Sequence, residues 1–161
     1  EVTIRPLDAY GALAYLRTRD DVLADRVALQ GWSNGGSATL AAMANTAPGI
    51  NSLTPATGFR IALAFYPACG LKRKFPDGIR PYAPVWMFHG TADEEVSPPG
   101  CAEFAARSRA SGGDVHYAVY PGATHGFDDP GHSHRKNPAN SVAAHDAIKR
   151  AIALLAGVLK P

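Results

Sequence analysis

Four short apolar runs along the chain predict β-strands. They lie at 26–32 (RVALQGW), 60–67 (RIALAFYP), 84–90 (PVWMFHG) and 115–122 (VHYAVYPG). Each run is rich in β-branched or aromatic residues, and glycine or proline bounds most of them, as is typical of strands. The first three runs are almost continuously apolar instead of alternating with polar residues. This indicates strands that are covered on both faces.

Helical patterns separate these runs. They lie at 6–19, 34–47, 98–113 and 140–160. The third begins with proline in its first turn and ends at two glycines, which are good start and stop signals. The last predicts a long closing helix with four large apolar residues on or near one face, namely Val142, Ile148, Ile152 and Leu155.

The alternation of strands and helices favours a mostly parallel sheet with helices on both sides. We therefore expect an α/β fold, a parallel sheet of about four strands with helices on both faces. No linker or internal repeat divides the chain, so we expect a single domain over residues 1–161. A chain of this length can bury about 70% of its unfolded surface, which is enough to support a core.

The charge balance and the hydropathy exclude several classes of protein. Sixteen basic residues are met by 14 acidic ones, and a net charge of +2 is too mild to argue for a nucleic-acid partner. No apolar stretch approaches the roughly 18 residues of a membrane span, and no signal segment is visible. We expect neither a nucleic acid nor a membrane as partner. The chain opens at Glu1 without a methionine, so we expect that a leader or a larger N-terminal part lies outside this sequence.

The candidate nucleophile is Ser33, in a glycine-rich turn. Residues 31–35 (GWSNG) fit the pattern G-x-S-x-G, with a predicted strand before it and a predicted helix after it. On such a turn the serine is strained and exposed, and the flanking glycines permit close packing of strand and helix. A serine hydroxyl is a poor nucleophile until a base removes its proton. The alternative is a plain turn serine, so the interpretation depends on a base and an acid elsewhere.

Both partners follow in the order Ser, Asp, His. Asp93 lies just beyond the third predicted strand and His125 just beyond the fourth. The carboxyl ends of parallel strands meet at one edge of the sheet, so these residues converge on Ser33. His125 would take the serine proton and Asp93 would orient the imidazole. The backbone N–H of Asn34 would be one donor of the oxyanion hole.

Several other residues are candidates with alternative roles. Glu94 and Glu95 are neighbours that could replace Asp93, and His125 could be an ordinary loop histidine. Trp32 and Phe127 flank the catalytic residues and either line a substrate pocket or simply pack. The other histidines are expected to be structural or solvated: His89, His116, His132, His134 and His145. His132 and His134 share a loop, but two ligands make a poor metal site, and we expect no metal or cofactor.

Taken together, four motifs resemble a known family. The segments GWSNGG, FYPACG, HGTADEEVSP and YPGATHGFDDP, in this order, are similar to the C-terminal part of an α/β-hydrolase. They are most similar to the dienelactone hydrolase family, and the prolyl-oligopeptidase-like hydrolases share much of the pattern. Dienelactone hydrolases proper carry cysteine as the nucleophile, whereas this chain has Ser33. The resemblance therefore favours a general carboxylesterase over a lactone-specific enzyme.

The resemblance implies a serine hydrolase that cleaves small carboxylic esters through an acyl-enzyme. A prolyl-oligopeptidase-like peptidase is the nearest enzyme alternative, but it would normally need an added substrate-binding domain. The family sheet has about eight strands, and the half that usually donates the second oxyanion N–H is absent here. The other alternative is therefore a weakly active or inactive half-fold that needs a partner chain.

The missing half has a consequence for the strand that runs from Arg26 to Trp32. In the family this strand lies in the middle of the sheet, and without its neighbour it presents an unpaired edge. We expect a homo-oligomer or the missing N-terminal half to cover that edge.

The resemblance also implies that the two cysteines lie close together in the fold. Cys69 and Cys101 follow neighbouring strands, so they either form a disulfide or remain two buried thiols. A disulfide would favour a periplasmic or secreted protein, and free thiols a cytoplasmic one.

Overall fold

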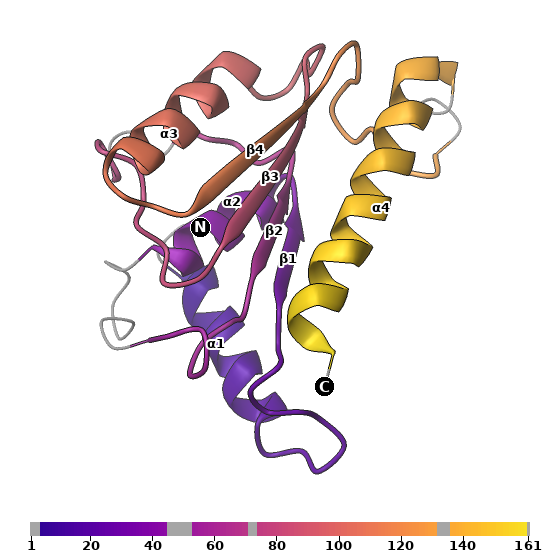
Figure 1. The fold of residues 1–161 in the computed structure, drawn as a ribbon. Coiled ribbons are helices and arrows are strands. Elements are labelled where there is room, and N and C mark those ends of the chain that lie inside the picture. Colours follow the sequence, from indigo (N-terminus) through magenta and orange to yellow (C-terminus); the bar gives the residue numbers. More distant parts are fainter. Residues whose placement is uncertain (1–3, 45–52, 71–73, 132–135, 161) are drawn as a thin grey trace.

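A computed structural model describes residues 4–44, 53–70, 74–131 and 136–160. Helices and strands alternate along the chain (Figure 1). In order they are α1 (Arg5–Leu16), β1 (Leu29–Trp32), α2 (Asn34–Met43), β2 (Ala62–Phe65), β3 (Val85–Gly90), α3 (Pro98–Ala110), β4 (Val115–Tyr120) and α4 (Pro138–Leu159).

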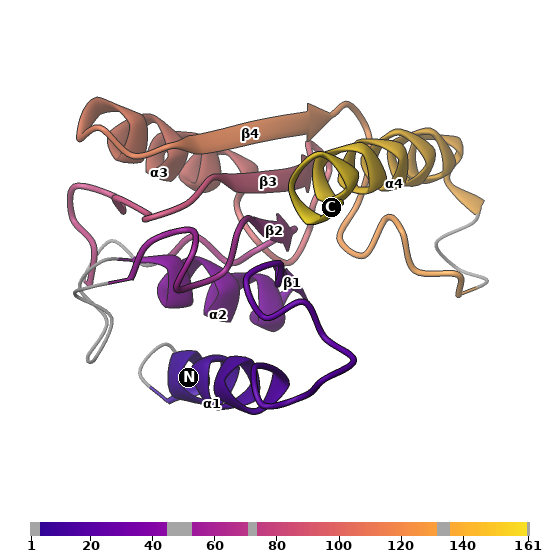
Figure 2. The same cartoon turned by 60° about the horizontal axis from the view of Figure 1, so that its bottom comes forward.

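The four strands form one parallel sheet in the order β1-β2-β3-β4. Figure 2 shows them side by side, with each strand next to its successor in the chain. The register aligns Gly31 with Ala64, and Ala64 in turn with Met87. All four carboxyl ends therefore lie at the same edge of the sheet. The predicted α/β fold with a four-stranded parallel sheet is confirmed.

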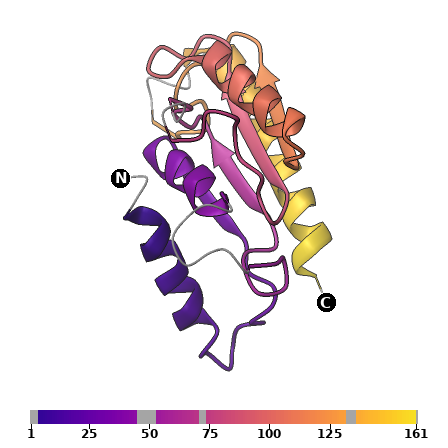
Figure 3. The ribbon, with the colours of Figure 1, turned by 90° about the vertical axis from the view of Figure 1, so that its left-hand side faces the viewer.

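Both faces of the sheet are covered by helices. Figure 3 looks onto the face that carries α2 and α3, with α4 behind the sheet, and α1 packs beside α2. Successive residues of β3 point to opposite faces, so Met87 joins the core under α2 and α3, whereas Phe88 joins the core under α4. This explains why the central strands are almost continuously apolar, as the sequence indicated.

The face that α4 buries differs from the expectation. Ala143, Ala147 and Ala151 are buried at a spacing of four residues, whereas Ile148 and Ile152 are exposed. Of the four large apolar residues expected on or near one face, Val142, Ile148 and Ile152 are exposed, and only Leu155 is partly buried against the core. Short alanine side chains let α4 approach the sheet closely, because the aromatic rings of the core already fill the space between them.

β1 occupies one edge of the sheet. Within the described part of the chain, it is hydrogen-bonded to β2 and to no other strand. Its outer backbone groups are thus available for pairing.

The two cysteines form a disulfide in the structure, and their Sγ atoms are 2.04 Å apart. Cys69 lies in the segment after β2, and Cys101 lies in the first turns of α3. The bond therefore ties the segment after β2 to the start of α3, close to the carboxyl edge of the sheet.

Among the described residues, no helix combines the length and the apolar character needed to cross a membrane.

Candidate active site

Ser33 occupies the sharp turn between β1 and α2. Its backbone has φ 51° and ψ −118°, a conformation that L side chains rarely adopt. Its N–H donates to the carbonyl of Phe65 at 2.9 Å, which anchors the turn to β2. Asn34 is the first residue of α2, so its N–H has no acceptor within the helix. This places one free donor directly beside the serine.

Two glycines make this turn sterically feasible. A Cβ at Gly31 would lie 2.3 Å from the carbonyl oxygen of Gly35, and a Cβ at Gly36 would lie 2.9 Å from that of Phe65. A Cβ at Gly35 would meet nothing within 4 Å. The interpretation that both glycines of G-x-S-x-G allow close packing therefore holds for Gly31 and is wrong for Gly35. Gly36, one residue later, has that role.

The three predicted catalytic residues meet at the carboxyl edge of the sheet. The Nε2 atom of His125 lies 2.9 Å from Oγ of Ser33. The Nδ1 atom of His125 lies 3.0 and 3.1 Å from the two carboxylate oxygens of Asp93. Loops after β1, β3 and β4 thus bring together residues that are 92 and 32 positions apart. A proton can therefore pass from the hydroxyl of Ser33 to the imidazole of His125, and the carboxylate of Asp93 orients that imidazole.

The carboxylate of Asp93 is fully buried and well provided with donors. One of its oxygens, Oδ1, accepts the backbone N–H groups of Glu95 at 3.0 Å and Val96 at 2.9 Å. Burial by itself raises the pKa of Asp93, but these N–H groups and His125 outweigh it, and the net pKa is lowered. Asp93 is therefore held as the anion that a neighbouring imidazolium requires.

The two glutamates that were alternatives to Asp93 have other positions. The carboxylate of Glu94 accepts the backbone N–H of His125 at 3.2 Å, which supports the histidine loop. The carboxylate of Glu95 lies 3.5 Å from Nε2 of His125, on the side of the ring that faces Ser33. Neither glutamate is placed at Nδ1, where the orienting acid belongs.

A second histidine also lies against Asp93. His89 is completely buried, and its Nε2 atom is 2.9 Å from Oδ2 of Asp93. Within the described part of the chain, neither ring nitrogen has a well-directed hydrogen bond. Burial lowers the pKa of His89, although the nearby carboxylate opposes the shift. From the sequence we expected only that His89 is structural or solvated, not that it contacts Asp93. The short separation of four residues between the two could have suggested this contact.

A carboxylate that the sequence did not single out joins three loops of the site. Asp128 accepts the indole N–H of Trp32 at 2.8 Å and the hydroxyl of Tyr66 at 2.7 Å. The Tyr66 ring in turn contacts the His125 ring edge-on, with centroids 4.7 Å apart. Tyr66 has φ 34°, which ends β2 and turns its side chain toward the site. Asp128 thus links the loops that carry the serine and the histidine.

The two predicted pocket residues differ in their surroundings. Trp32 is 46% exposed and stacks on Phe65 at 5.6 Å. Phe127 is only 2% exposed and packs against the rings of Phe65, Tyr66 and Tyr120. Phe127 is therefore a core residue, and a substrate contact remains a prediction for Trp32 alone.

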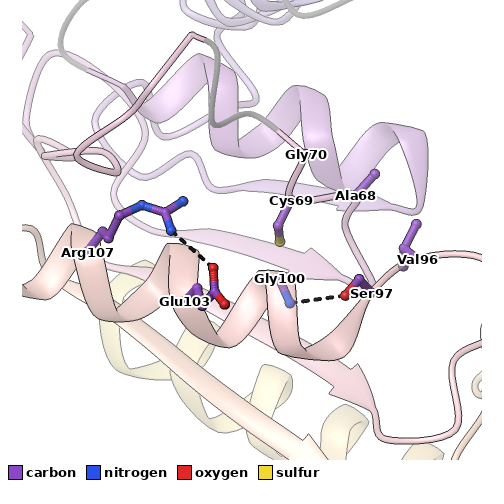
Figure 4. Close-up of a pocket in the computed structure, with 8 residues that line it drawn as sticks. All are labelled: Ala68, Cys69, Gly70, Val96, Ser97, Gly100, Glu103 and Arg107. Carbon is purple, nitrogen blue, oxygen red and sulfur yellow. Dashed lines mark hydrogen bonds and ion pairs between the residues drawn. The ribbon is translucent and has the colours of Figure 1, made fainter.

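A cavity of about 300 Å³ lies beside the disulfide, between the segment after β2 and helix α3 (Figure 4). Its lining residues are Ala68, Cys69, Gly70, Val96, Ser97, Gly100, Glu103 and Arg107. The dashed lines mark the bond from the N–H of Gly100 to Ser97 and the ion pair between Glu103 and Arg107. No member of the triad lines this cavity, so it neighbours the reactive atoms without containing them.

The described residues contain no group of three or more side chains suited to hold a metal ion. His116 stacks on Trp86 with centroids 4.3 Å apart and pairs with Asp114, while His145 is exposed. His132 and His134 lie outside the described residues.

Solved structures of similar fold are esterases and related hydrolases. A thermophilic esterase from Thermogutta terrifontis is 20% identical, with a TM-score of 0.67 over 97% of this chain and 65% of its own. A putative dienelactone hydrolase from Klebsiella pneumoniae is also 20% identical, with a TM-score of 0.67 over 92% of this chain and 59% of its own. Esterase 2 of Thermogutta terrifontis, phosphorylated by paraoxon, is 23% identical, with a TM-score of 0.64 over 96% of this chain and 64% of its own.

These likenesses show the fold, and the chain spans less than two thirds of the length of each of these solved relatives, 59–65%. No curated protein sequence matches the chain. The family model described as "Dienelactone hydrolase family" matches residues 5–159, almost the entire sequence. The match includes the serine turn, the Asp93 loop and the His125 loop, which are the segments that carried the resemblance in the sequence. The chain therefore belongs to the dienelactone hydrolase family, within the α/β-hydrolase fold.

Proposed function

We propose that this protein is a serine hydrolase that cleaves short-chain carboxylic esters. The observation that carries the proposal is the chain of contacts from Ser33 Oγ through both nitrogens of His125 to Asp93. A hydroxyl 2.9 Å from an imidazole that is itself oriented by a buried anion is set for nucleophilic attack.

The reaction follows from this geometry in two halves. His125 Nε2 takes the proton as Ser33 Oγ attacks the ester carbonyl, and Asp93 stabilises the imidazolium that results. The same Nε2 then gives the proton to the leaving alcohol, which departs and leaves an acyl-serine. In the second half a water molecule loses its proton to Nε2 and attacks the acyl group. Ser33 regains its proton, and the carboxylic acid is released.

The oxyanion of each tetrahedral intermediate needs donors beside Ser33. The N–H of Asn34 is one, and its position at the positive end of α2 adds to the stabilisation. The resemblance implies that the second donor comes from the N-terminal half of the family fold, in the loop after the third strand of the family sheet. Loss of one donor costs about 10²–10³ in rate, so this chain by itself should be a slow enzyme.

The similar structures support an ester substrate. The Thermogutta terrifontis protein is described as an esterase, and in one of its structures it is phosphorylated by paraoxon. Organophosphates such as paraoxon phosphorylate an activated nucleophile, and the candidate for it here is Ser33.

The decisive experiment is covalent labelling of the purified protein by a fluorophosphonate probe, read by intact mass. We expect one adduct in the wild type and none in Ser33→Ala. Hydrolysis of a short-chain nitrophenyl ester should show the same difference. An adduct that persists in Ser33→Ala, or no adduct in either protein, would contradict the proposal.

A second candidate, a half-fold that needs a complement, is favoured by the open edge of β1. We propose that the remaining strands of a hydrolase domain cover this edge, because the solved relatives are about half as long again as this chain. Light scattering of the dilute protein distinguishes the alternatives. A dimer would point to a second copy at the edge, and a stable monomer with full esterase activity would contradict the need for any complement.

A further inference from the structure

The carboxylate of Glu95 lies 3.5 Å from Nε2 of His125, the atom that protonates the leaving alcohol in the proposed reaction. This inference rests on the proposed function and deepens it by naming a class of substrate. His125 Nε2 can protonate the leaving oxygen only within hydrogen-bond reach, about 2.6–3.2 Å. Glu95 Oε2 is 3.5 Å from the same nitrogen. The two distances together keep the leaving oxygen within about 6.7 Å of the Glu95 carboxylate, whatever the ester.

Glu95 differs from the other carboxylates of the site because it has no structural task. Asp93 is saturated by His125 and two backbone N–H groups, and Glu94 accepts the backbone N–H of His125. Asp128 is bound by Trp32 and Tyr66. The side chain of Glu95 is 64% exposed, and among the described residues it forms no ion pair with lysine or arginine. Its negative charge is therefore available to a ligand.

A second feature of the site suits a cation. Trp32 directly precedes Ser33, and its indole is 46% exposed. Its N–H is bound to the carboxylate of Asp128, so this edge of the ring also faces negative charge. Tryptophan is the side chain whose ring best attracts quaternary ammonium groups, and Trp32 stacks on Phe65 while the residue stays 46% exposed.

We infer that Glu95 is a specificity-determining residue that selects esters whose alcohol carries a positive charge, such as a quaternary ammonium group two carbons from the oxygen. Such a charge can lie about 5 Å from the carboxylate. At that distance, attraction through a medium close to bulk water corresponds to about a three- to tenfold gain in kcat/KM. Esters with an anionic alcohol are disfavoured by the same interaction. High salt reduces both effects, because Glu95 is exposed.

The test compares two substrates of the same shape. Acetylcholine and 3,3-dimethylbutyl acetate differ in a nitrogen and a carbon, so their kcat/KM ratio isolates the charge. We expect a ratio of about three to ten in the wild type at low salt. Glu95→Gln should lower the ratio toward one. Because Glu95 lies 3.5 Å from Nε2 of His125, the substitution can also change the reactivity of Ser33, but that change affects both esters and cancels in the ratio. The matched control is Glu103→Gln, on the surface of α3 beside Arg107, which should leave the ratio unchanged.

Each outcome is decisive. A ratio near one in the wild type, or a ratio that Glu95→Gln does not change, overturns the inference and leaves the proposed function intact. If turnover of both esters is too slow, two phosphonates with thiocholine and 3,3-dimethylbutanethiol leaving groups give the same ratio from the rate of Ser33 labelling. Failure of both phosphonates to label Ser33 contradicts the proposed function, and the inference falls with it.

Discussion

The serine turn allows a sharp test with two alanine substitutions four residues apart. In Gly31→Ala the new Cβ would lie 2.3 Å from the carbonyl oxygen of Gly35 and 2.6 Å from Oγ1 of Thr39. An ordinary contact begins at 3.4 Å, so the first turn of α2 must move by about 1 Å. Overpacking of this kind costs about 1–3 kcal/mol of stability. The same shift displaces Ser33 from His125, and a misplacement of about 1 Å can cost about 10²-fold in rate.

Gly35→Ala is the matched control because the same methyl group enters open space. Nothing lies within 4 Å of its Cβ, and Gly35 lies in the first turn of α2. Alanine is favoured over glycine in a helix by about 0.5–1 kcal/mol, so stability should stay unchanged or rise. The free energy of unfolding is measured in urea by tryptophan fluorescence, and the reactivity of Ser33 by the rate of fluorophosphonate labelling.

The comparison has a clear refutation. If Gly31→Ala unfolds at the same urea concentration as the wild type and is labelled at the same rate, the steric account of the turn is wrong. If Gly35→Ala is as damaging as Gly31→Ala, the two glycines act through a shared property other than space for Cβ.

Three further predictions concern the acid, its buried neighbour and the disulfide. Asp93→Asn should lower kcat/KM for a short-chain nitrophenyl ester by about 10⁴, because a neutral amide cannot stabilise the imidazolium of His125. A loss of less than tenfold would contradict the role of Asp93 as the orienting acid. Burial lowers the pKa of His89, so the unfolded chain binds more protons than the folded protein as the pH falls below about 6.5. The free energy of unfolding should therefore decrease from pH 6.5 toward pH 5, by at most about 1.4 kcal/mol per pH unit for this group, and His89→Gln should flatten that slope in urea titrations. Asp93, whose pKa is also lowered, adds a loss of the same sign at pH values below about 4. Replacing both cysteines, Cys69 and Cys101, by alanine opens a loop of 32 residues and should cost about 3–4 kcal/mol in the chain-entropy account. Alkylation of the unreduced protein is the first check, and two reactive thiols would rule the disulfide out.

Much of this protein could be predicted from the sequence, because the signals are local. Continuous apolar runs next to glycine or proline predict buried strands, and β1 to β4 all lie within the predicted segments. The predicted strand ends at Trp32 and the predicted helix begins at Asn34, so Ser33 alone must form the turn between them. The meeting of Ser33, Asp93 and His125 then follows from the parallel sheet, since every loop after a strand lies at the same edge.

Only the tertiary structure decided which side chains meet across that edge. The bonds of Asp128 to Tyr66 and Trp32 join residues 62 and 96 positions apart, and no local pattern encodes such a pair. The same is true of α4, where periodicity pointed to the large apolar residues, but the fully buried apolar positions are alanines, and of the four large residues singled out only Leu155 packs against the core. A sequence pattern records what each residue prefers, whereas close packing decides which of these preferences can be met together.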